Sequence, residues 1–147
     1  MDKQSDVMAI LKLYELRRDE EMRSARKWYF SEFAPQNVMD ILKLYRGGER
    51  ASAYFRMVTS YWEMAASFVN NGGIDTKIFL DAGTEHIFVF SKIEPFLAEI
   101  RATFSEPDYL SQLETLVLSI PDIEQKLENR RRLSATWTNA NKEKSTP

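Results

Sequence analysis

The stretch from Glu49 to Asp75 reads ERASAYFRMVTSYWEMAASFVNNGGID and contains the strongest helical signal in the chain. Its apolar residues recur at steps of three and four: Ala51, Tyr54, Phe55, Val58, Tyr61, Trp62, Ala65, Phe68 and Val69. That spacing places them on one side of a single helix of about six turns. Asn70-Asn71-Gly72-Gly73 then ends the helix, because these residue types accept positive φ. So wide an aromatic face has to be buried by other helices, and we expect the rest of the chain to pack around it.

The composition limits the possible classes of protein. At 147 residues the chain fits one domain with a substantial core. Cysteine is absent, which excludes disulfides, thiolate zinc sites, iron–sulfur clusters and cysteine nucleophiles. The 20 basic and 22 acidic residues nearly cancel, which argues against a dedicated polyanion binder. Since no stretch approaches the roughly 20 apolar residues of a membrane span, we expect a soluble, cytoplasmic, all-α protein.

The remaining periodic segments predict a single-domain bundle of five or six helices. Residues Ser5 to Phe33 are expected to form one long helix, with the charged run RRDEEMRSARK on its solvated face. A short helix follows from about Pro35 to Arg46 and ends on two glycines. Asp75 to Ala82 predicts another short helix, which Asp75 caps.

Pro95 lies inside the second-best apolar stripe, on a helix expected over residues 86–104. The stripe consists of Val89, Phe90, Ile93, Phe96, Leu97, Ile100 and Phe104. Proline has no N–H, so the carbonyl of Ser91 loses its helical donor. Because the periodicity continues through Pro95, we expect a kink there and not the end of the helix.

Two similar motifs introduce the last two expected helices. Ser105-Glu-Pro-Asp108 and Ser119-Ile-Pro-Asp122 each place a capping hydroxyl three residues before a carboxylate, which is typical of a capping box. The last helix is expected to reach Trp137. Residues 138–147 are small or polar and predict a disordered tail, so the helical domain is expected over residues 1–137.

The sequence contains no recognisable catalytic constellation. His86 is the only histidine, and on an apolar face we expect it to be packed with one nitrogen hydrogen-bonded. A zinc site would need further nitrogen or sulfur ligands, and a di-iron site would need paired Glu-x-x-His motifs. Neither a G-x-S-x-G elbow nor a phosphate-binding loop occurs. We therefore expect no enzyme activity, no metal and no cofactor.

Two polar clusters are candidate sites for a ligand or partner. Glu63 lies beside Trp62, and Arg56 lies two turns earlier on the same stripe. If this stripe faces another helix, Arg56 and Glu63 could bind a ligand or a protein partner. We favour the alternative that the stripe lies on the surface and binds nothing. Arg130, Arg131 and Arg132 form a basic patch in a C-terminal segment, residues 121–147, with a net charge of +2. No aromatic residues alternate with them, so we expect a solvated helix end and no specific nucleic-acid binding.

Several motifs resemble a family of bacterial all-helical domains of unknown function. They are Ala53-Tyr54-Phe55, Tyr61-Trp62-Glu63 and Gly72-Gly73-Ile74-Asp75, followed by Pro95 and Arg101. In that family an aromatic-aromatic-Glu helix precedes a Gly–Ile–Asp corner, and a later helix carries Pro and Arg. The resemblance covers about residues 50–101. It implies an all-α fold and no particular activity, and the N-terminal membrane helix of many members has no counterpart in this sequence.

Three functions remain open, and the first is our leading hypothesis. It is a non-catalytic protein-interaction or regulatory module that forms a homodimer. The first helix has more apolar residues than one core-facing stripe can bury, namely Met8, Leu13, Leu16, Trp28 and Phe30. Trp137 of the last helix adds to this apolar surface. Alternatively, the two ends of the chain pack on each other within one molecule.

The other two functions would use different parts of the chain. One is a small-molecule sensor with a pocket between helix 49–71 and helix 86–104. The other is a nucleic-acid accessory protein that uses Arg130 to Arg132. An enclosed apolar cavity beside Glu63, Arg56 or His86 would favour the sensor, whereas a flat exposed aromatic patch would favour a partner interface.

Overall fold

The computed structural model describes the backbone of residues 2–145 and the side chains of residues 2–140, and every regular element within them is a helix. The elements are α1 (Lys3–Arg17), α2 (Glu20–Ser31), α3 (Val38–Arg46), α4 (Arg50–Asn70), α5 (Thr76–Ala82), α6 (Glu85–Ile93), the 3-10 helix η1 (Glu94–Phe96), α7 (Leu97–Phe104), α8 (Ser111–Leu118) and α9 (Ile123–Ser145). The all-α prediction is confirmed. None of the described helices is long and apolar enough to cross a membrane.

Helix α4 is the element around which the others pack, as its apolar stripe predicted. Phe55, Val58 and Ala65 are fully buried, and Trp62 is 2% exposed. The most extensive contacts of α4 are with α2 and α8. Gly72 follows the helix at φ +82°, which is the positive φ expected after its C-terminus.

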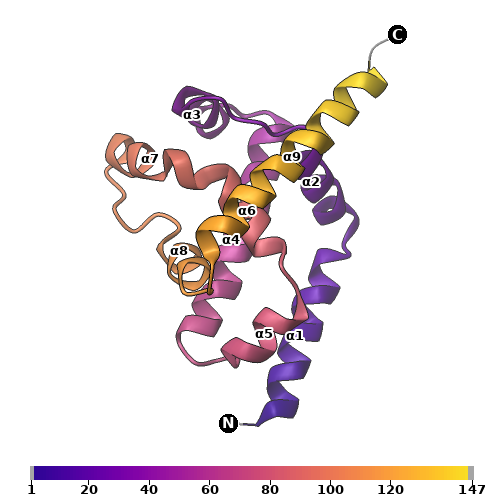
Figure 1. Ribbon diagram of the computed structural model, residues 1–147, viewed down its shortest axis with the longest axis vertical. Coiled ribbons are helices and arrows are strands. Elements are labelled where there is room, and N and C mark those ends of the chain that lie inside the picture. Colours follow the sequence, from indigo (N-terminus) through magenta and orange to yellow (C-terminus); the bar gives the residue numbers. More distant parts are fainter. Residues whose placement is uncertain (1, 146–147) are drawn as a thin grey trace.

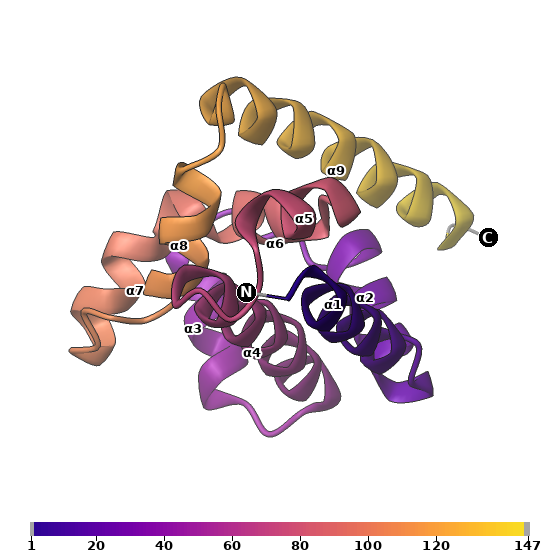
Figure 2. The ribbon, with the colours of Figure 1, turned by 90° about the horizontal axis from the view of Figure 1, so that it is seen from below.

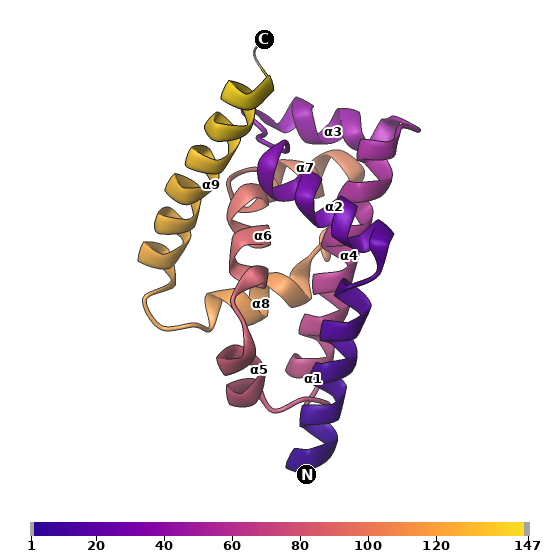
Figure 3. The same cartoon turned by 90° about the vertical axis from the view of Figure 1, so that its right-hand side faces the viewer.

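The helices form layers, with α6 in the middle. Figures 2 and 3 show α6 between α9 on one side and α4 on the other, and α6 contacts both of these helices. Helix α1 lies beside α4 on the side away from α9 (Figure 3), whereas α2 contacts both α4 and α9. The two ends of the described chain lie at opposite ends of the long axis (Figure 1).

The long first helix expected over Ser5 to Phe33 is two helices, α1 and α2. Asp19 interrupts it, because its carboxylate accepts a hydrogen bond from the Met22 N–H at 3.2 Å and caps α2. The break lets Leu13 of α1 and Tyr29 of α2 both reach the core. Because the apolar periodicity is interrupted at Arg18, one straight helix could not bury both faces.

The expected kink at Pro95 is instead a short 3-10 helix between two α-helices. Helix α6 ends at Ile93, η1 carries Pro95, and α7 begins at Leu97. The Ser91 carbonyl, which the proline leaves without a helical donor, accepts a hydrogen bond from Arg131 Nε at 3.2 Å. With both long helices divided, the expected number of five or six helices is too low.

The two expected capping boxes do not form. Ser105 adopts a left-handed conformation with φ 53°, directly after α7, and α8 begins only at Ser111. The Ser119 hydroxyl donates to the Leu116 carbonyl of the preceding helix at 2.6 Å. Asp122 has φ 57°. Burial of Leu110 and Ile120 in the core sets the path of these turns and overrides the local capping signal.

Helix α9 packs along α6 and α2 and continues to Ser145, beyond residue 137 where the tail was expected to begin. Thr138 is buried, and its hydroxyl donates to the Ser134 carbonyl at 3.0 Å. Residues 146 and 147 of the expected tail lie outside the described residues. Trp137 stacks on Phe88 with ring centroids 5.2 Å apart and meets the edge of Phe30. The last helix therefore packs within its own chain.

Candidate functional site

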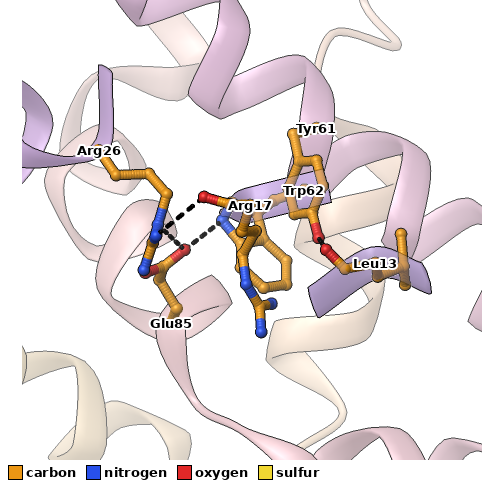
Figure 4. A network of polar contacts seen from close by, with 6 residues as sticks. All are labelled: Leu13, Arg17, Arg26, Tyr61, Trp62 and Glu85. Carbon is orange, nitrogen blue, oxygen red and sulfur yellow. Dashed lines mark hydrogen bonds and ion pairs between the residues drawn. The ribbon is translucent and has the colours of Figure 1, made fainter. Parts of the chain in front are cut away.

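Glu85, the first residue of α6, forms a polar network that joins three helices to the end of α1. Its carboxylate accepts hydrogen bonds from Arg26 Nη2 at 2.7 Å and from Trp62 Nε1 at 3.1 Å. Arg26 comes from α2 and Trp62 from α4, and Arg26 Nη1 also donates to the Arg17 carbonyl at 3.4 Å. Figure 4 shows these side chains converging. The network fixes the C-terminal end of α1 against the bundle.

Two further contacts hold α1 in place. The Tyr61 hydroxyl donates to the Leu13 carbonyl at 2.5 Å (Figure 4), and burial raises the pKa of Tyr61 to about 12, so the phenol stays protonated. Asp6 is buried and accepts a hydrogen bond from the backbone N–H of Asp75 at 3.0 Å, directly before α5. Helix α1 is thus attached to α4 through Leu13 and, near the N-terminus of α1, to the start of α5 through Asp6.

A cavity of about 290 Å³, here named the apolar cavity, lies between α1, α4, α5 and α6. Its lining is Ile10, Leu11, Leu13, Tyr14, Arg17, Trp62, Phe79, Ala82, Gly83 and His86. Leu11 and Tyr14 are 53% and 50% exposed and form its rim, whereas Phe79 and His86 are buried and form its inner wall. Its volume lies just below the usual range for small-molecule sites, roughly 300–1,000 Å³.

His86 is a buried, uncharged part of this wall. It is 1% exposed, as expected for a packed histidine. We also expected one ring nitrogen to be hydrogen-bonded, but Nε2 has no hydrogen-bond partner among the described residues. The ring lies 5.3 Å from Phe79 and 5.8 Å from Trp62, centroid to centroid. Burial, and after it the charges of Arg17 and Arg130, lower the pKa of His86 to about 4. The imidazole is therefore neutral at pH 7.

A second cavity, here named the arginine mouth, adjoins the first. Its volume is also about 290 Å³, and it is lined by Tyr14, Arg17, Arg18, Arg23, Arg26, Trp62, Gly83, Thr84 and Glu85. The two cavities share Tyr14, Arg17, Trp62 and Gly83. The Arg17 guanidinium lies over the Trp62 ring at 5.0 Å and marks the boundary between them.

The charge of the arginine mouth is only partly neutralised. Arg26 is paired with Glu85, whereas Arg17, Arg18 and Arg23 form no ion pair with another described residue. From the sequence we expected this charged run to lie on a solvated helix face, so the arginine mouth was not predicted. The interruption at Arg18 was the available signal, because a helix break there brings the arginines on its two sides to one cavity.

The four predicted ligand or partner residues occupy different places. Trp62 and His86 meet in the wall of the apolar cavity. Glu63 instead faces α8, where its carboxylate accepts hydrogen bonds from the N–H groups of Gln112 at 3.2 Å and Leu113 at 2.7 Å. Arg56 is exposed and donates to the Ser52 hydroxyl at 2.7 Å. The structure does not bring Arg56 and Glu63 together.

The three arginines of the predicted basic patch take part in contacts within the chain. Arg130 lies over the Phe88 ring at 4.9 Å. Arg131 pairs with Glu94 at 2.7 Å, and Arg132 approaches Glu128 at 3.7 Å. Among the residues whose side chains are described, no group of three or more His, Asp or Glu residues is placed to hold a metal ion.

Fold and site together define an all-helical domain with an apolar cavity that opens beside a cluster of arginines. Residues 4–120 match the family described as Domain of unknown function (DUF4760), and the chain belongs to this family. The match extends well beyond residues 50–101 and confirms the resemblance that the sequence motifs indicated. No curated protein and no solved structure shows significant similarity to the chain.

Proposed function

We propose that this domain is a non-catalytic module that binds a small molecule in the apolar cavity. The observation that carries the proposal is the cavity itself, with His86 and Trp62 in its wall and a mostly apolar lining. An apolar pocket with a few polar groups is the usual form of a small-molecule site. Of the functions left open by the sequence, this geometry favours the sensor over the protein-interaction module.

The position of the cavity suggests how occupancy would be communicated. Five of its lining residues belong to α1: Ile10, Leu11, Leu13, Tyr14 and Arg17. The same helix is attached to the bundle through the Tyr61–Leu13, Asp6–Asp75 and Arg26–Arg17 contacts. A ligand that fills the cavity would therefore add contacts to α1 and change how firmly this helix is held.

Binding can be tested with N-phenyl-1-naphthylamine, an uncharged apolar dye whose fluorescence rises in apolar surroundings. We expect saturable binding of one dye per chain. Ala82 lines the cavity, so Ala82→Phe should fill part of its volume and weaken dye binding about tenfold or more. Fluorescence titration at fixed protein concentration measures both affinities.

Ala98→Phe is the matched control, because Ala98 is also an exposed alanine but lies on α7, away from the cavity. It should bind the dye as tightly as the unmodified chain. Equal affinity of the two variants, or no saturable binding to the unmodified chain, would contradict the proposal.

Self-association is the second candidate, and exposed apolar residues of α1 favour it. Val7, Met8, Leu11, Tyr14 and Leu16 are each between 44% and 60% exposed. Val7, Leu11 and Tyr14 recur at steps of four and three and so form one exposed strip along the helix, which reaches the rim of the apolar cavity at Leu11 and Tyr14. Such a strip could pack against the same helix of a second copy across a two-fold axis.

A further inference from the structure

We propose that the ligand of this domain is an amphipathic anion, with its apolar body in the apolar cavity and its anionic head in the arginine mouth. The inference rests on the proposed function and adds the chemical class of the ligand. It follows from the two cavities being joined and from their different chemistry.

The first step is the continuity of the two cavities. They share Tyr14, Arg17, Trp62 and Gly83, so a molecule that fills one extends to the wall of the other. Gly83 has no side chain, and no atom of a residue other than its two chain neighbours lies within 4 Å of the position that a Cβ would take there. Gly83 therefore adds no side chain to the boundary that the two cavities share.

The second step is the distribution of charge. Arg26 is neutralised by Glu85 at 2.7 Å, which leaves Arg17, Arg18 and Arg23 as guanidinium groups without an ion pair among the described residues. The Cζ atom of Arg17 lies over the rings of Trp62 and Tyr14, 5.0 and 5.5 Å from their centroids. A guanidinium has five N–H donors, and carboxylate or phosphate oxygens are their preferred acceptors.

The third step is the orientation of the ligand. The inner wall of the apolar cavity is formed by Phe79 and by His86, which is buried and neutral, so it offers no charge to an anion. Among the residues that line the two cavities, the positive groups are Arg17 at the boundary and Arg18, Arg23 and Arg26 in the arginine mouth. An anionic head therefore belongs in the arginine mouth, and the apolar part of the ligand lies against Phe79 and His86.

The test uses three probes with the same alkyl chain and different heads: decanol, decanoate and decyl phosphate, each below its critical micelle concentration. Calorimetry gives the affinities. The imidazole signals of 15N-labelled His86, the only histidine, report whether the alkyl chain of the probe enters the apolar cavity. We expect all three probes to shift these signals and the anions to bind about tenfold more tightly than decanol, with the difference shrinking at high salt. Comparison of decanoate with decyl phosphate distinguishes the two kinds of head.

The variant Arg18→Gln/Arg23→Gln should remove most of the preference for anions, measured as the ratio of the anion affinity to the decanol affinity of the same protein. Both side chains are exposed, so the fold should tolerate the change. Arg50→Gln/Arg132→Gln is the matched control, because it removes two exposed arginines that do not line the mouth. Equal affinity for the three probes, or an anion preference that survives Arg18→Gln/Arg23→Gln, would overturn the inference and leave the proposed function standing. Failure of decanol and of the neutral dye to bind would remove the proposed function itself.

Discussion

At the scale of single residues, the unusual group is His86. A histidine exposed to water is half protonated near pH 6.5, and burial of a positive charge is unfavourable. His86 is enclosed by Trp62 and Phe79 and lies near the positive groups of Arg17 and Arg130. These surroundings lower its pKa to about 4. The folded chain therefore keeps the imidazole neutral over a pH range in which the unfolded chain protonates it.

This difference predicts a specific loss of stability in mild acid. Between about pH 6.5 and pH 4 the unfolded state binds a proton that the folded state does not. The free energy of unfolding should therefore fall as the pH falls through this window, by up to about 3 kcal/mol from this one group. Urea unfolding at several pH values measures the effect.

His86→Asn separates the histidine from the carboxylates that also titrate in acid. The variant should be less sensitive to pH between 6.5 and 4 than the unmodified chain. An independent check is the NMR titration of the His86 ring, which should have its midpoint near pH 4. A midpoint near 6.5 would contradict the burial described here.

At the scale of elements, two ends of helices are completed by side chains from distant parts of the chain. Glu63 of α4 accepts hydrogen bonds from the Gln112 and Leu113 N–H groups at the start of α8. Arg131 of α9 donates to the Ser91 carbonyl beside Pro95. Helix termini need such partners because the first N–H groups and the last C=O groups of a helix have none within it. Here tertiary contacts do the work of local caps.

Removal of the Glu63 carboxylate should loosen the start of α8. We expect Glu63→Ala to lower the free energy of unfolding by about 1–2 kcal/mol, as for the loss of an N-cap. In the variant, amide hydrogen exchange of Gln112 and Leu113 should be faster than in the unmodified chain, whereas exchange of the amides in α6 should not change. Glu106→Ala is a suitable control, since Glu106 is exposed and its side chain makes no described hydrogen bond. If Gln112 and Leu113 exchange at an unchanged rate, the capping role is wrong.

At the scale of the whole molecule, the two ends of the chain differ in how they are covered. Helix α9 packs on α6 and α2, and Trp137 has Phe88 and Phe30 as partners. Trp28 and Phe30 of α2 are partly buried against the core. Helix α1 keeps an exposed apolar strip, with Val7 44%, Leu11 53% and Tyr14 50% exposed. The case for self-association therefore rests on α1 alone.

If the strip on α1 forms an isologous interface, the chain should be a dimer at tens of micromolar in sedimentation equilibrium. Val7→Glu, in the strip and outside the cavity lining, should then shift the chain to a monomer, because two carboxylates would be buried next to apolar side chains. Met39→Glu places the same charge on α3, at a methionine that is 46% exposed, and should leave the dimer intact. A folded, purely monomeric chain would exclude self-association and leave the ligand-binding proposal untouched.

The candidate site was predicted only in part. Trp62 and His86 were singled out from the sequence because each is distinctive in its own helix, and both line the apolar cavity. Arg17, Arg18, Arg23 and Glu85 were not, because nothing local distinguishes them from other charged residues on solvated faces. Their place in the site depends on residues far away in the sequence: Glu85, for example, joins the arginine mouth by pairing with Arg26.

The sequence by itself determined the all-α class, the bounds of α4 and the absence of cysteine chemistry. Helical periodicity and a Gly–Gly end are set by residues three or four positions apart, so they can be read locally. The break at Asp19, the 3-10 helix at Pro95, the cap from Glu63 and the two joined cavities were decided only by the tertiary structure. Each of them depends on which apolar faces are buried together, and that burial, being collective and non-directional, outweighs the small local preferences of capping and turn residues.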